Sequence, residues 1–146
     1  MKLRTDLPLG WRIGAGLKAL VIPVLLLIVP LDRLTRWLGR TPDKPREAPP
    51  DAAVSDWIDN LLHRLPWPWR HTCLRRSAVL YHLLRRAGRA VQLCVGVKRN
   101  DVGALAAHAW LTLDGEPYLE SRSNGAELHE DFTIIARFPE PIQGAA

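Results

Sequence analysis

The stretch CLRRSAVLYHLLRRAG (residues 73–88) predicts the central helix of the fold. Pro68 in the connector WPWRHT (67–72) and Pro66 just before it disfavour helix there, so Thr72 is the expected N-cap and Cys73 the first helical residue. Gly88 suits the position that ends a helix. Free backbone N–H groups and the helix macrodipole stabilise a thiolate at such an N-terminus. Cys73 is therefore either an activated nucleophile or a small apolar core residue, and this stretch alone leaves both interpretations open.

Projected at about 100° per residue, this helix presents two opposite faces. The side chains on one face are those of Cys73, Ser77, Leu80, Tyr81 and Leu84, and those on the other are Arg75, His82 and Arg86. We expect the first face to pack inward and the second to be solvated.

Composition limits the classes of protein. A chain of 146 residues with 47% hydrophobic residues allows one domain and an appendage. The 20 Lys and Arg against 15 Asp and Glu, a net charge of +5, suggest an anionic membrane surface or an acidic peptide as partner. Nucleic acid is disfavoured, because no DNA-binding motif or stacking aromatic pattern accompanies the charge. Two cysteines form no disulfide framework, and His71 with Cys73 lacks further zinc ligands, so we expect no metal and a reducing cytoplasm.

The apolar run ALVIPVLLLIVPL (residues 19–31) resembles a membrane span but is too short, and Pro23 and Pro30 interrupt it. No small-residue cleavage site follows, so a secretory signal is also disfavoured. We expect a helical hairpin or an interfacial helix, with arginines nearby for anionic headgroups, or else plain core packing. Those arginines are Arg33, Arg36 and Arg40.

The chain divides into three segments. Residues 1–39 form an apolar and basic helical segment, residues 40–51 (RTPDKPREAPPD) a proline-rich linker, and residues 52–146 the main domain. The main domain begins with a helix that Pro66 ends. The apolar stripe of this helix consists of Val54, Trp57, Ile58, Leu61, Leu62 and Leu65.

Two strands follow the central helix. Alternation over residues 91–98 predicts a strand in which Cys94 packs in the core, and AAHAWLTL (106–113) predicts another with His108, Trp110 and Thr112 on one face. The pair Asp-Gly at 114–115 then turns the chain.

The hairpin register decides which residue lies opposite His108. A three-residue loop would pair Thr112 with Glu116 and put Glu120 opposite His108, whereas a two-residue loop would put Ser121 there. Asp114 lies at the turn, too far along the strand to reach the histidine. We therefore expect the three-residue loop, with Glu120 as the orienting carboxylate.

A cysteine at a helix N-terminus, then a histidine strand, then a carboxylate is the order found in papain-like and transglutaminase-like cysteine enzymes. CLRRSAVLYHLLRRAG, QLCVGVKR and HAWLTLDGEPYLE together resemble the C-terminal domain of lasso-peptide B2 proteins, which are leader peptidases of transglutaminase-like fold. The resemblance spans roughly residues 54–138, and VPLDRLTRWLGR (29–40) resembles the family's N-terminal segment. It implies an α+β fold with N-terminal helices and an antiparallel sheet that carries histidine and acid.

The resemblance implies roles for three residues: Cys73 as nucleophile, His108 as general base and Glu120 as the third triad member, where the family more usually has aspartate. It implies no cofactor. A second donor for the oxyanion, beside the Cys73 backbone N–H, stays unassigned.

The implied partners are a precursor peptide, a separate leader-recognition protein of the B1 type and an ATP-dependent macrolactam synthetase. We expect a cytoplasmic protein, with peripheral contact at the inner face of the membrane or with an exporter through residues 11–40 as an open alternative. Two other functions stay open. One is a transglutaminase-like acyl transferase, and the other is a non-catalytic scaffold that tethers the precursor to a membrane-associated complex.

Overall fold

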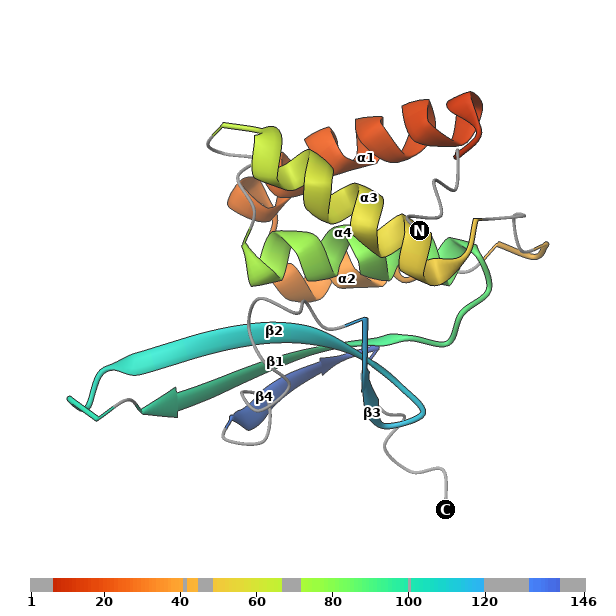
Figure 1. Cartoon of the computed structure of the whole chain (residues 1–146). Coiled ribbons are helices and arrows are strands. Elements are labelled where there is room, and N and C mark those ends of the chain that lie inside the picture. The colour runs from red at the N-terminus through yellow and green to blue at the C-terminus, as the bar shows by residue number, and fades with distance from the viewer. Residues whose placement is uncertain are drawn as a thin grey trace, which may run out of the picture.

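The computed structural model describes residues 7–40, 42–44, 49–66, 72–99, 101–119 and 132–139. Within them a layer of helices lies against one face of an antiparallel sheet (Figure 1). The helices are α1 (Leu9–Ile28), α2 (Leu31–Leu38), α3 (Asp51–Arg64) and α4 (Cys73–Arg86); the strands are β1 (Gln92–Arg99), β2 (Leu105–Leu113), β3 (Glu116–Tyr118) and β4 (Thr133–Phe138). This arrangement agrees with the expected α+β class.

The long β1–β2 hairpin forms the centre of the sheet, whose strand order is β3-β2-β1-β4. His108 on β2 lies opposite Gly96 on β1. A Cβ atom at Gly96 would come within 2.9 Å of both Trp110 and Phe132. Glycine is therefore needed at this position, because it leaves room for the two aromatic rings that pack beside His108.

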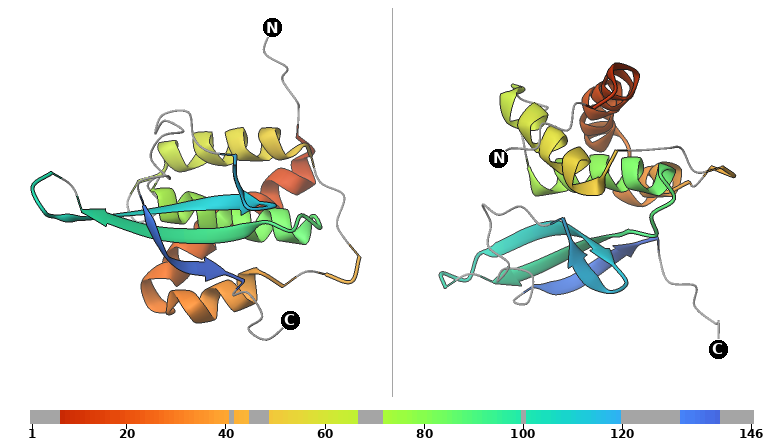
Figure 2. Two further views of the ribbon diagram at one scale, coloured as in Figure 1. Left: turned by 90° about the horizontal axis from the view of Figure 1, so that it is seen from below. Right: turned by 45° about the vertical axis from the view of Figure 1, so that its right-hand side comes forward.

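Helix α4 is the central element of the core. It packs on β1 and β2 and also contacts α1, α2 and α3 (Figures 1 and 2). The N-terminal segment 1–39 contributes described residues to the same core as the main domain 52–146. The largest side chains of this core that are no more than 3% exposed are Ile22, Leu34, Leu38, Val54, Ile58, Leu62, Val79, Leu80, Tyr81, Leu84, Val91, Leu93 and Leu111.

Both predicted ends of α4 are confirmed. The Thr72 side chain accepts a hydrogen bond from the backbone N–H of Arg75 (3.2 Å). At the other end Gly88 adopts a positive φ of 87°. The Arg89 N–H bonds back to the Leu84 carbonyl (3.0 Å), which completes a Schellman C-cap.

The expectation that the outer face of α4 is solvated is wrong for His82, which is only 5% exposed. Its Nδ1–H donates to the Leu38 carbonyl (3.0 Å), and its ring stacks on Trp37 with centroids 5.8 Å apart. The reason is that α2 covers this side of α4. A two-face projection assumes one buried side, and α4 has neighbours on several sides.

The predicted interruption of the N-terminal apolar run at Pro23 is also wrong. Helix α1 continues through Pro23 and is 20 residues long. By length and composition alone it could cross a membrane, a test that core helices and signal sequences also pass. One side of α1 is packed in the core, with Ala19 fully buried and Ile22 1% exposed.

The predicted three-residue hairpin loop is wrong as well. Leu113 pairs with Glu116 and Thr112 pairs with Pro117, so the turn between β2 and β3 has two residues. Both turn residues have positive φ, 53° at Asp114 and 82° at Gly115, which is the geometry that an Asp-Gly type I′ turn provides.

Gly39, at the end of α2, allows α2 to approach α4 closely. A Cβ atom there would lie 2.3 Å from the Tyr81 hydroxyl and 3.0 Å from the Thr35 carbonyl oxygen. We expect Gly39→Ala to lower the free energy of unfolding by about 1–3 kcal/mol, because the added methyl group overpacks this contact. Chemical denaturation measures the change.

Gly14→Ala is the matched control, since Gly14 lies inside α1 with nothing within 4 Å of its ideal Cβ position. Alanine in a helix is more stable than glycine by about 0.5–1 kcal/mol. An equal gain in stability at both positions would contradict the packing described for Gly39.

Candidate active site

Cys73 lies where the sequence predicted it, as the first residue of α4, and is partly buried. The pKa of its thiol is lowered. The largest cause is a hydrogen bond with the His108 side chain; burial opposes it, and backbone hydrogen bonds at Ala109 and Leu74 lower the pKa further. The structure thus brings Cys73 and His108 together and favours the thiolate, the reactive form of cysteine.

Aromatic rings hold the His108 side chain from two sides. Its ring stacks on Trp110, with centroids 5.6 Å apart and planes inclined by 19°. Phe132 lies against it at 5.4 Å and is itself covered by the Lys98 ammonium, 4.7 Å from the ring centroid. These contacts restrict rotation of the imidazole, so it stays directed toward its hydrogen-bond partner.

Ser77 fixes the position of α4 along β2. Ser77 is 1% exposed, and its hydroxyl donates a hydrogen bond to the Ala109 carbonyl (3.2 Å). Ala109 is also the strand residue whose backbone bonds to Cys73, and it directly follows His108. Ser77 lies one helical turn after Cys73, so a single stretch of β2 binds both helix residues and sets the distance between thiol and imidazole.

Arg76 joins three parts of the molecule and is 5% exposed. Its Nε donates to Asp59 (2.6 Å) and its Nη2 to Ser55 (2.8 Å), both on α3. The same Nη2 donates to the Leu119 carbonyl, directly after β3. Leu119 has a positive φ of 54°, so the chain leaves the sheet at the residue that Arg76 holds.

Tyr118, the last residue of β3, forms a second tie to α3. Its hydroxyl donates to Asp51, the first residue of α3, which also pairs with Arg89 (3.2 Å). Burial, together with the hydrogen bond to this carboxylate, raises the pKa of Tyr118 to about 12. The end of β3 is therefore attached to α3 through two successive residues, Tyr118 and Leu119.

Glu120 lies outside the described residues, as do Ser121 and His71. The register argument for Glu120 no longer holds, because the two-residue turn would align Ser121 with His108 if pairing continued. Pairing between β2 and β3 ends at Tyr118. The role of Glu120 stays a prediction that rests on the family resemblance and on its place directly after Leu119.

Sequence reasoning missed the structural role of Arg76. Its spacing of three from Cys73 places it near the same face of α4, a signal that was available. An arginine on an apolar helix face needs an acidic partner, and the sequence does not show that Asp59, 17 residues earlier, is that partner.

Cys94 is fully buried near the Thr112 hydroxyl, which confirms the prediction that it packs in the core.

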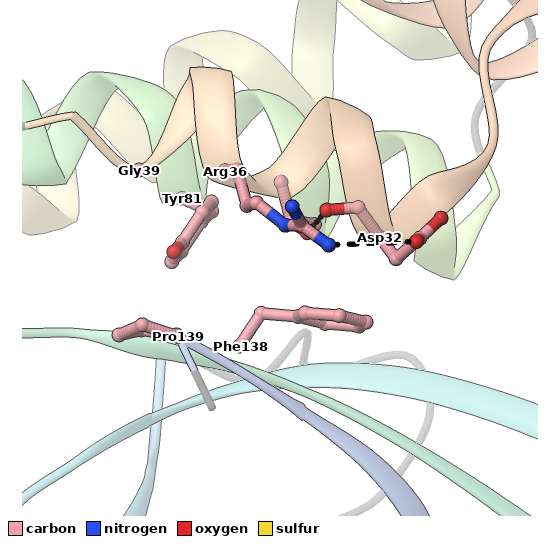
Figure 3. A pocket seen from close by; sticks show the side chains of 7 residues that line it. Asp32, Arg36, Gly39, Tyr81, Phe138 and Pro139 are labelled. Carbon is pink, nitrogen blue, oxygen red and sulfur yellow. Dashed lines mark hydrogen bonds and ion pairs between the residues drawn. The ribbon is translucent and has the colours of Figure 1, made fainter. Parts of the chain in front are cut away.

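A cavity of about 350 Å³ lies apart from these residues, between α2, α4 and the end of β4 (Figure 3). Asp32 and Arg36 line one side and Tyr81, Phe138 and Pro139 others, without Cys73 or His108. The buried Tyr81 hydroxyl has no hydrogen-bond partner in the described part of the chain. No group of three or more His, Cys, Asp or Glu side chains that could hold a metal ion occurs within that part.

Comparison with known families supports the fold. A family model described as the transglutaminase-like superfamily matches residues 19–137, which include α2, α3, α4, β1, β2, β3 and all of β4 but its last residue. Searches of curated proteins and of solved structures gave no significant match. The match begins inside α1, so it covers helices that pack on α4 as well as the pair of Cys73 and His108.

We expect iodoacetamide to alkylate Cys73 with a pH midpoint below that of an ordinary thiol, because its pKa is lowered and the thiolate is the reacting form. His108→Ala removes the largest cause of this shift and should move the midpoint to higher pH. The pH dependence of the alkylation rate, followed by mass spectrometry, measures both. His63→Ala, at an exposed position on α3, is the control. An unchanged midpoint in His108→Ala would contradict the assigned contact.

We expect Arg76→Ala to lower the free energy of unfolding by about 3–5 kcal/mol, because it leaves Asp59 and the Leu119 carbonyl without their common partner. Urea unfolding measures the loss. Arg64→Ala, an exposed arginine on α3, should change stability by less than about 0.5 kcal/mol. Equal effects of the two substitutions would show that the Arg76 contacts are not important for stability.

Proposed function

The chain belongs to the transglutaminase-like superfamily, and we propose that it is a cysteine peptidase that removes the leader segment from a lasso-peptide precursor. The superfamily includes both cysteine peptidases and acyltransferases. The observation that carries the proposal is the hydrogen bond between Cys73 and His108, which lowers the pKa of a thiol at a helix N-terminus. The choice of a lasso-peptide precursor rests on the sequence resemblance of residues 54–138 to B2 leader peptidases.

The proposed reaction begins at the thiolate. Cys73 Sγ attacks the carbonyl carbon of the bond between leader and core, while the Cys73 backbone N–H donates to the oxyanion. The imidazolium of His108 gives its proton to the departing amine of the core peptide, which leaves the leader attached as a thioester. His108 then takes a proton from water, whose oxygen attacks the thioester, and the released thiolate completes the cycle.

Glu120 is the proposed carboxylate that orients His108. Two observations support a position close to the site. Leu119, the preceding residue, is held by Arg76, and Arg76 lies three residues after Cys73 on the same helix. Glutamate in place of the family's more usual aspartate adds one methylene group to the side chain of the proposed orienting acid.

The proposed reaction implies a pathway with other proteins. A separate B1-type protein would bind the leader and present the precursor. An ATP-dependent macrolactam synthetase would take the freed core amine and close the ring. We propose that the chain works in the cytoplasm, where these partners and a reduced Cys73 would be available.

The acyl transferase alternative uses the same thioester and differs only in its acceptor, which is an amine in place of water. The partly buried position of Cys73 favours neither acceptor. The mass of the product separates them: hydrolysis adds one water to the leader fragment, whereas transfer adds the mass of the amine.

The test is mass spectrometry of a candidate precursor incubated with the full chain and its leader-recognition protein. We expect cleavage at one bond between leader and core, and complete loss of that cleavage in Cys73→Ala and in His108→Ala. Cys94→Ala is the matched control, because it removes the other cysteine, which is buried near the Thr112 hydroxyl, and it should retain activity if it stays folded.

Glu120→Gln measures the third position separately from the other two. We expect a fall in kcat of roughly 10⁴-fold if Glu120 holds the imidazole as a triad acid does. A loss of less than about tenfold would remove Glu120 from the mechanism and leave the pair of Cys73 and His108. If Cys73→Ala supports the same precursor processing as wild type, the peptidase proposal is wrong and the scaffold alternative replaces it.

A further inference from the structure

The outer side of α1 presents a stripe of large apolar side chains to solvent. They are between 39% and 73% exposed and comprise Leu9, Ile13, Leu17, Leu20, Val21, Leu27 and Ile28. Projected at about 100° per residue, all of them fall within an arc of about 120°. The opposite arc contains the buried residues Ala15, Ala19, Ile22 and Pro23. Helix α1 is therefore apolar on both sides, and the described protein covers only one of them.

This outer stripe faces away from the rest of the molecule. Helix α1 lies on the side of the helical layer that is farthest from the sheet (Figures 1 and 2). A contiguous apolar surface of this kind on a helix marks a site of contact with a membrane or another macromolecule.

Basic residues lie beyond both edges of the stripe. In the same projection Lys18 falls between the stripe and the buried arc, Arg12 is an exposed residue within the range of the buried arc, and α1 contains no acidic residue. Residues 9–40 contain five basic residues and one acid, Asp32, so they carry most of the net charge of the chain. An apolar stripe on such a basic segment matches the boundary between the acyl chains and the anionic headgroups of a bilayer.

Helix α2 adds an exposed aromatic ring on the same layer of helices. Trp37 is 50% exposed and stacks on His82 of α4. An exposed indole is typical of the headgroup region of a membrane.

We propose that the outer face of α1 docks the protein on an anionic lipid bilayer, with α1 lying in the plane of the interface. The proposal does not depend on the peptidase function. A second copy fits this face less well, because pairing would bring together two segments that each carry an excess of basic residues. A membrane-spanning orientation would remove Ala19 and Ile22 from the core that they share with α4.

The test is co-sedimentation of the full chain with vesicles of phosphatidylcholine alone and of phosphatidylcholine mixed with phosphatidylglycerol. We expect binding to the anionic vesicles that weakens with added salt. Leu17→Glu should weaken it at least about tenfold, because a large apolar side chain is replaced by an anion. Leu17 is 58% exposed, so circular dichroism should show an unchanged fold.

Leu105→Glu is the matched control, with the same change of charge at a leucine that is 69% exposed on β2. It should bind vesicles as wild type does. An equal loss of vesicle binding in both variants would show that binding depends on net charge and would overturn the proposal. Absence of wild-type binding to anionic vesicles would overturn it as well. Self-association that Leu17→Glu abolishes, without vesicle binding, would make the face a dimer interface. Protein that alkaline carbonate fails to release from vesicles would show insertion across the bilayer and overturn the interfacial orientation.

Discussion

The burial of α4 between the sheet and the other helices is the constraint on which the rest of the structure depends. A helix with neighbours on several sides must give most of its polar side chains hydrogen-bond partners, since an unpaired buried polar group costs about 1–3 kcal/mol. Arg76 bonds to α3, Ser77 to β2, and His82 and Arg85 to the last carbonyls of α2. These bonds fix both the rotation of α4 and its position along its axis. The helix can therefore present the first residue of its N-terminus at one fixed place.

The candidate site follows from that constraint. Cys73 has the free N–H groups of a helix N-terminus, but its thiol acquires a lowered pKa chiefly because β2 brings His108 to it. The position of α4 along β2 is set by Ala109, which bonds to Ser77 through its carbonyl and to Cys73 through its backbone N–H. Gly96 completes the arrangement from the neighbouring strand, since only glycine leaves room for the rings that hold the imidazole. The site is thus assembled by helix packing and strand pairing together.

Local signals in the sequence predicted most of the elements. The stripe of α3, the caps of α4 at Thr72 and Gly88, and the alternation of β1 and β2 each depend on neighbours in sequence, and each is confirmed. The failures have another origin. An Asp-Gly pair is compatible with hairpin loops of two or three residues, so the register of β3 was open. His82 and Pro23 were misjudged because tertiary contacts decide whether a polar residue is buried and whether a helix continues through proline.

The short β3 illustrates how tertiary bonds replace sheet pairing near the site. The strand has three residues and its ladder with β2 ends at Tyr118. The end of the strand and the residue after it are attached to α3 and α4, through Tyr118 to Asp51 and through the Leu119 carbonyl to Arg76. The chain therefore leaves the β2 ladder at a residue that the helix layer holds, and Arg76, which holds it, lies three residues after Cys73 on α4.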